Sequence, residues 1–171
     1  MTTENNASPI WDFVLGYYRQ QGVSEAAISL QDSAGIDVNM ILFLMWLASQ
    51  KRTLAAAEVK TVGDKSIGWQ HNVVVPVRAV RRLLKENAPL VEQEAALAFR
   101  KKVQALEIEG EQLQLMAMAS LSQGLKSSSA ASTEAAAREN LSAFQSVSGK
   151  MFPQPAVDGF VNALKAMTDG K

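Results

Sequence analysis

The sequence contains no cysteine and a single histidine, His71, among its 171 residues. Without cysteine the chain has no disulfide framework, no thiol nucleophile and no zinc–thiolate site. One histidine leaves little room for a metal site built on imidazole ligands. Lys plus Arg and Asp plus Glu number 17 each, so the formal net charge is zero. A dedicated nucleic-acid-binding protein normally carries a basic surplus, and this balance argues against one.

The chain also lacks a long apolar run and a signal sequence. Its most apolar stretch, residues 38–48, is interrupted only by Asn39. At about 1.5 Å per helical residue this stretch spans roughly half of a bilayer core. Residues 1–8 are polar and acidic, and they have neither the basic start nor the apolar segment of a secretory signal. We therefore expect no membrane span and a cytoplasmic protein.

Sequence patterns of catalysis are missing as well. The chain has no glycine-rich phosphate-binding loop, no G-x-S-x-G nucleophile elbow and no H-E-x-x-H pair. Its apolar content of 47% is ordinary for a globular protein, and its length fits one domain or one domain with a tail. We regard an enzyme as the minority interpretation and expect no cofactor.

What the sequence does contain is apolar residues at helical spacing. This pattern predicts helices that begin near Pro9, Ser24, Val38 and Thr53, with Asp37 as the cap of the third. The third helix is apolar on almost every side, which is typical of the middle of a bundle. No alternating pattern is long enough to build a sheet. The expected fold is all-α, a bundle of about five to six helices.

Two longer helical features follow. Residues 66–86 predict a helix that is kinked or restarted at Pro76, because proline removes a backbone donor. A long helix is expected over about residues 88–125, roughly 55 Å in length, which is longer than a compact domain needs. Its apolar stripe recurs at a mean spacing near 3.75 and consists of Val91, Ala95, Phe99, Val103, Leu106, Gly110, Leu113, Ala117 and Leu121.

The clearest boundary in the chain is the Ser- and Ala-rich segment 126–132. We interpret it as a linker between an all-α domain over residues 9–125 and a short, weakly helical C-terminal tail over residues 133–171.

Two charged patches of opposite sign lie within the zero net charge. The basic patch falls on one helix face, suits an anion or an acidic partner segment, and consists of Arg78, Arg81, Arg82 and Lys85. The acidic patch consists of Glu107, Glu109 and Glu111. A carboxylate metal site in a bundle also needs Glu-x-x-His pairs, and no glutamate stands three residues before His71, so we expect no metal there. The alternatives are that the two patches pair with each other or are solvated.

A third set of residues places polar groups among apolar and aromatic ones. This candidate polar network or pocket consists of Asp12, Gln31, Asp32, Asp37, Asn39, Trp46 and Trp69. A buried carboxylate or amide needs partners, because leaving it unpaired costs several kcal/mol. Asn39 is the hardest to place, since uniformly apolar residues follow it. A structural polar network is the favoured interpretation, and a ligand pocket is the alternative.

Several of these residues stand in an order that resembles one family. They are Trp11-Asp12-Phe13, Tyr17, Leu30-Gln31-Asp32, Gly35-Ile36-Asp37-Val38-Asn39, Phe43, Trp46, Trp69, Pro76 and Arg81-Arg82-Leu83. The chain resembles a family of short, mostly proteobacterial proteins catalogued as domain of unknown function 2390. The resemblance covers about residues 9–125 and is most specific at Asp37-Val38-Asn39 with the apolar helix after it. It implies a bacterial helical protein and brings no activity, cofactor or catalytic residue.

The leading hypothesis is a small protein-interaction or adaptor module that binds a protein partner or itself. It rests on the over-long helix, the methionines Met116 and Met118 near its end, the basic patch and the missing catalytic motifs. The alternative is a bundle that binds or transforms a small molecule, with a pocket near Asp12, Asn39, Trp46 and Trp69. Nucleic acid is the least favoured partner.

Overall fold

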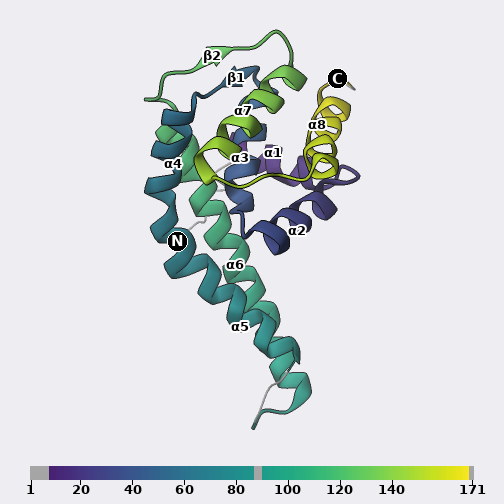
Figure 1. The fold of residues 1–171 in the computed structure, drawn as a ribbon. Helices are drawn as coiled ribbons and strands as arrows, with labels where there is room; N and C mark the ends of the chain where they lie inside the picture. Colours follow the sequence, from purple (N-terminus) through teal and green to yellow (C-terminus); the bar gives the residue numbers. More distant parts are fainter. Residues whose placement is uncertain (1–7, 87–89, 170–171) are drawn as a thin grey trace.

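The computed structural model describes residues 8–86 and 90–169 as an all-α protein (Figure 1). Its elements are α1 (Pro9–Tyr18), α2 (Val23–Ala34), α3 (Val38–Ser49), β1 (Arg52–Thr53), α4 (Ala56–Trp69), η1 (Gln70–Val74), α5 (Val75–Glu86), α6 (Gln93–Ser122), β2 (Ser128–Ser129), α7 (Thr133–Ser148) and α8 (Gln154–Asp169). Because α4, η1 and α5 run on without a break, the described residues form seven helices instead of the expected five to six. None of these helices has the length and apolar character that crossing a bilayer requires.

Local signals set the ends of several helices. Pro9 is the first residue of α1, where its missing N–H breaks no helical hydrogen bond. Asp37 caps α3, as predicted, because its carboxylate accepts a hydrogen bond of 2.9 Å from the backbone N–H of Asn39. Gly35, in the left-handed conformation with φ 59°, ends α2 two residues before this cap.

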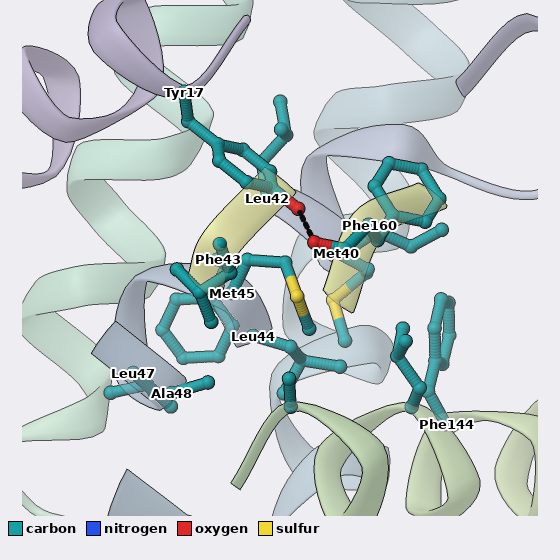
Figure 2. Close-up of a cluster of buried hydrophobic side chains, with 14 of the residues drawn as sticks. Tyr17, Met40, Leu42, Phe43, Leu44, Met45, Leu47, Ala48, Phe144 and Phe160 are labelled. Carbon is teal, nitrogen blue, oxygen red and sulfur yellow. Dashed lines mark hydrogen bonds between the residues drawn. The ribbon is translucent and has the colours of Figure 1, made fainter. Parts of the chain in front are cut away.

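The centre of the fold is α3, of whose twelve residues nine are buried. A helix that is apolar all round must be covered on every side. Figure 2 shows its side chains between Tyr17 of α1, Phe144 of α7 and Phe160 of α8. The phenol of Tyr17, fully buried, donates a hydrogen bond of 2.6 Å to the backbone carbonyl of Phe160, and burial raises the pKa of this phenol. This bond joins the two ends of the chain across the core.

The two C-terminal helices belong to this same core. α7 packs on α3 and α4, and α8 packs on α2 and α7. Their fully buried residues include Ala136, Ala137, Leu141, Phe160 and Leu164. The expectation of a tail set apart by a linker differs from this arrangement, because small and apolar residues of α7 and α8 cover sides of α3 that α1 and α6 leave open.

The segment expected to be a linker is held in place by backbone pairing. β1 and β2 form a two-stranded antiparallel sheet in which Arg52 pairs with Ser129 and Thr53 with Ser128. The backbone N–H of Ala130 donates to the carbonyl of Lys51 at 2.8 Å. Because residues 52–53 are a strand, the fourth helix begins at Ala56 and not at Thr53.

The helix that contains Pro76 neither stops nor restarts there. Instead, the five residues of η1 form a π-helical turn directly before α5, in which the N–H of Val75 bonds to the carbonyl of Gln70. A proline cannot donate to the carbonyl four residues earlier, and its ring crowds that carbonyl. The wider π turn accommodates this loss and keeps the helix continuous.

The longest helix is α6, with 30 residues, about 45 Å at 1.5 Å per residue. It begins five residues later than predicted and ends three residues earlier. It runs back along α5, and the two helices project together beyond the rest of the molecule (Figure 1). We call α5 and residues 93–113 of α6 the hairpin.

The face that α6 buries coincides only in part with the stripe that its apolar pattern predicted, since Val103 and Gly110 belong to both. Its buried residues are Ala96, Val103, Glu107, Gly110, Gln114, Leu115, Met118 and Ser122. In contrast, Phe99, Leu106 and Leu113 of the predicted stripe are 54%, 58% and 48% exposed. In the projecting part, α5 covers only one side of α6, and this side is selected by charged residues that pair across the hairpin.

Candidate functional site

A cleft of about 820 Å³ lies where the hairpin meets α1, α2 and α3. One wall consists of apolar and aromatic residues of α1 and α2, namely Trp11, Leu15, Tyr18 and Ile28. The opposite wall consists of basic residues of the hairpin, namely Arg81, Arg82, Lys85 and Arg100. Asp37, Asn39, Arg78, Glu107 and Glu111 are among the other lining residues. We call this space the cleft.

Ion pairs between α5 and α6 form one side of the cleft. Arg78 donates from Nε to Glu107 at 2.8 Å and from Nη2 to Glu111 at 2.6 Å, and Arg81 also pairs with Glu107. The side chain of Glu107 is only 7% exposed. Although burial alone raises the pKa of Glu107, hydrogen bonds from Arg81 and Arg78 hold it below its usual value. At Glu111 burial prevails over the attraction of Arg78, and the pKa is raised.

A second polar group ties the start of α3 to α6. Asn39 donates from Nδ2 to Oε1 of Gln114 at 2.8 Å, and Gln114 donates from Nε2 to Asp37 at 2.8 Å. Burial raises the pKa of the Asp37 carboxyl, against the opposing effect of the hydrogen bonds from Asn39 and Gln114. The side chains of Asn39 and Gln114 are buried. Their mutual hydrogen bond supplies the partner that the buried amide of Asn39 needs.

Gln114 is a residue of this network that sequence reasoning missed. It stands among leucines and methionines late in α6, and no motif marks it. Its position seven residues after Glu107 and four residues after Gly110 was the only available signal, because these spacings place the three residues on one helix face. That signal could be read only once the buried face of α6 was known.

Three basic residues of the cleft are left without a carboxylate. Arg82, Lys85 and Arg100 form no ion pair or hydrogen bond with any part of the chain that the structure describes. Nε of Arg100 is buried and has no hydrogen-bond partner among residues 8–86 and 90–169. A buried N–H without a partner is costly, so the guanidinium of Arg100 lacks one of the acceptors that it requires.

A smaller pocket of about 330 Å³ shares Arg78, Arg82 and Asp37 with the cleft. The π turn of η1 places Gln70 and His71 on its wall. Gln70 is only 7% exposed, and its Oε1 atom has no hydrogen-bond partner within the described residues. π turns are frequent at functional sites, and this one widens the polar surroundings of the cleft.

The two charged patches meet at the cleft, but not all of their residues pair with each other. All four basic residues, Arg78, Arg81, Arg82 and Lys85, line the cleft, but only Arg78 and Arg81 pair with the acidic patch. Glu107 and Glu111 line the cleft as well. Glu109 is exposed, lies outside the cleft lining, and forms no ion pair in the described structure.

The residues of the candidate polar network are dispersed. Gln31, Asp32, Asp37 and Asn39 line the cleft. Asp12 and Trp46 instead line a separate depression beside the C-terminal helix. Trp69 lines a different pocket, between α4 and α6, and its indole N–H donates to the carbonyl of Gly110 at 2.9 Å. The structure therefore does not bring Asp12, Asn39, Trp46 and Trp69 into one pocket. Across the described ranges, no three His, Asp or Glu residues are placed to hold a metal ion.

Comparison with known families connects this site to a larger group. A family model described as a protein of unknown function, DUF2390, matches residues 9–118. The chain belongs to this family. The resemblance inferred from the sequence is thus confirmed, although the match ends before Leu125. Every residue that lines the cleft, from Trp11 to Leu115, lies inside the DUF2390 match, whereas α7 and α8 lie beyond it. No curated protein and no solved structure matches the chain.

Proposed function

We propose that this DUF2390 protein is an interaction module and that the hairpin is its binding surface for a second copy of the chain. The observation that supports this proposal is the distribution of exposed apolar residues. Of sixteen large apolar side chains exposed in the described structure, twelve lie between Ile67 and Leu113, on or next to the hairpin. A projecting pair of helices cannot bury such residues against its own fold, and exposed apolar patches of this kind are typical of interfaces.

The most regular part of this surface is an apolar stripe along α6, which consists of Phe99, Leu106 and Leu113. These residues recur every seven positions, so they lie two turns apart on one helix face, about 21 Å from first to last. None of them lines the cleft. A seven-residue repeat of large apolar side chains favours pairing with another helix.

The charges beside the stripe favour an antiparallel second copy as that helix. Lys102 and Glu109 each precede a stripe residue by four positions, and both are exposed and form no ion pair in the described structure. If two α6 helices cross antiparallel about Leu106, Phe99 of each faces Leu113 of the other. The same register places Lys102 next to Glu109 of the second copy, twice by symmetry. This self-complementarity is what a two-fold interface requires.

A charge-exchange experiment tests the proposal. Light scattering coupled to size exclusion should show a dimer for the wild type. Lys102→Glu places two carboxylates together at each end and is expected to weaken the dimer at least tenfold, about 1.4 kcal/mol. The double exchange Lys102→Glu with Glu109→Lys restores opposite charges and should restore the dimer.

The matched control is Lys101→Glu. It makes the same charge change at the preceding residue, which lies on another face of α6 than the apolar stripe. It should leave the dimer unaffected. A wild-type chain that stays monomeric at all concentrations tested would overturn the proposal, and so would a double exchange no better than the single variant. Thermal unfolding of each variant checks that the fold is retained, as expected for exposed positions.

A further inference from the structure

We infer that the cleft binds a small organic anion, with its carboxylate, phosphate or sulfonate group on the basic wall and its apolar part on the aromatic wall. The volume of about 820 Å³ lies within the range typical of small-molecule sites, about 300–1,000 Å³. Residues from α1, α2, α3, α5 and α6 line it, so the fold itself and not one loop shapes the space.

The basic wall supplies the binding group for the anion. Arg78 and Arg81 are already paired with Glu107, whereas Arg82, Lys85 and Arg100 have no partner in the described residues. The buried Nε atom of Arg100 lacks an acceptor there. A carboxylate, phosphate or sulfonate group can accept from one guanidinium with two of its oxygens, which gives such contacts both strength and direction.

Five carboxylates also line the cleft, but none of them pairs with Arg82, Lys85 or Arg100 in the described structure. Asp32 and Glu86 line the cleft but are exposed and form no ion pair with the three unpaired basic residues. Asp37 is held by Gln114 and the backbone of Asn39. The unpaired basic groups of the cleft are therefore at the hairpin, on Arg82, Lys85 and Arg100.

The aromatic wall, formed by residues of α1 and α2, favours a ligand that has an apolar part as well as a charge. Leu15 is 44% exposed and Ile28 is 56% exposed, and both face the cleft together with Trp11 and Tyr18. Covering apolar surface of this kind with a ligand is favourable, because the surface is removed from water. A ligand with an anionic group and an apolar body satisfies both walls, and inorganic phosphate satisfies only one.

This inference does not rest on the proposed pairing of hairpins. The apolar stripe of Phe99, Leu106 and Leu113 lies outside the cleft lining. A variant of the stripe therefore separates the two proposals, since it changes one surface and leaves the other intact.

Isothermal titration calorimetry with three probes tests the site. Octyl phosphate, below its micelle concentration, carries both features, inorganic phosphate carries only the anion, and 1-octanol carries only the chain. We expect octyl phosphate to bind at least tenfold more tightly than either of the others. Equal affinity for inorganic phosphate would show that the aromatic wall contributes nothing and would contradict the inference. No binding of octyl phosphate would also overturn it.

Variants then locate the probe. Arg82→Gln and Arg100→Gln should each weaken octyl phosphate about tenfold, and Lys101→Gln, a matched neutralisation outside the cleft lining, should not. Phe99→Ser should also leave the affinity unchanged. If Phe99→Ser removes binding while Arg82→Gln does not, the probe sits on the apolar stripe and the inference is wrong. Arg82 is exposed, so its replacement is not expected to unfold the protein.

Discussion

Arg78 of α5 and Glu107 of α6, 29 positions apart in the chain, form an ion pair of 2.8 Å inside the hairpin. Their side chains are only 17% and 7% exposed. The pair joins the two charged patches that cancel in the net charge, and it also forms one side of the cleft. The same contact thus holds the hairpin together and leaves the neighbouring basic residues, Arg82 and Lys85, without carboxylates.

Replacement of Glu107 tests how much this contact stabilises the fold. Glu107→Ala removes a carboxylate that accepts from both Arg78 and Arg81 and leaves these charges only partly compensated. We expect the free energy of unfolding to fall by about 3 kcal/mol, the order found when one partner of a buried pair is removed. Urea denaturation measures it. Glu109→Ala, on the exposed side of the same helix, should change it by less than about 0.5 kcal/mol; similar losses for both variants would contradict the prediction.

The pH dependence of stability tests the surroundings of Asp37. Burial raises the pKa of its carboxyl above the ordinary value of 3.8. The folded state therefore keeps a proton over a pH range in which the unfolded chain has lost it. The contribution of Asp37 to the free energy of unfolding accordingly decreases as the pH rises from 3.8 through the folded pKa.

Asp37→Asn removes this titration. We expect the difference in unfolding free energy between the variant and the wild type to shift in favour of the variant as the pH rises from about 4 to about 7. Urea denaturation of both proteins at each pH gives this difference. A difference that stays constant, or shifts the other way, would show that the pKa of Asp37 is not raised by folding.

Asn140 of α7 tests how the C-terminal helices are held. Its fully buried amide accepts from the N–H of Leu54 at 3.0 Å and donates to the carbonyls of Leu44 and Arg52 at 3.1 and 3.0 Å. At about 1 kcal/mol for each bond, Asn140→Ala should lower the free energy of unfolding by about 3 kcal/mol. Asn162→Ala, at an exposed position of α8, should leave it within about 0.5 kcal/mol. Thermal or urea unfolding of both variants decides, and equal effects would contradict the prediction.

A shortened chain tests the division at the Ser- and Ala-rich segment. A chain that ends at Leu125 lacks α7 and α8 and would expose much of α3, including the side chains that pack on Phe144 and Phe160. We expect it to show no cooperative unfolding transition by circular dichroism. A sharp transition would instead establish residues 9–125 as an independent domain and residues 133–171 as a dispensable tail.

The elements that the sequence predicts well are those set by local rules. Pro9 begins α1 and Asp37 caps α3 because a proline at a helix start and a capping carboxylate act within four residues of themselves. The central place of α3 follows from its uniformly apolar composition. The π turn before Pro76 could not be predicted from the sequence. A helix can adapt to the backbone donor that proline lacks by a kink, a restart or a wider turn, and the local sequence does not select among them.

The arrangement of the candidate site was harder to predict from the sequence. The basic and acidic patches were visible, but their pairing depends on how α5 and α6 lie together. Gln114 had no motif, and Trp69 was grouped with Asn39 although the two line different pockets. Residues on one helix face can be read from spacing, whereas the partner that each face meets cannot.

By itself, the sequence determined an all-α protein of the DUF2390 family with a central apolar helix, because helical spacing, capping and family motifs are written into neighbouring residues. Only the tertiary structure decided which face of α6 is buried. The sequence pattern favoured burial of Phe99, Leu106 and Leu113, but α6 instead buries the adjacent face, which carries the ion pairs of Glu107 and the amide of Gln114. Because a neighbouring helix covers only one side of α6, the apolar stripe stays exposed. Three basic residues of the hairpin line the cleft without a partner in the described structure.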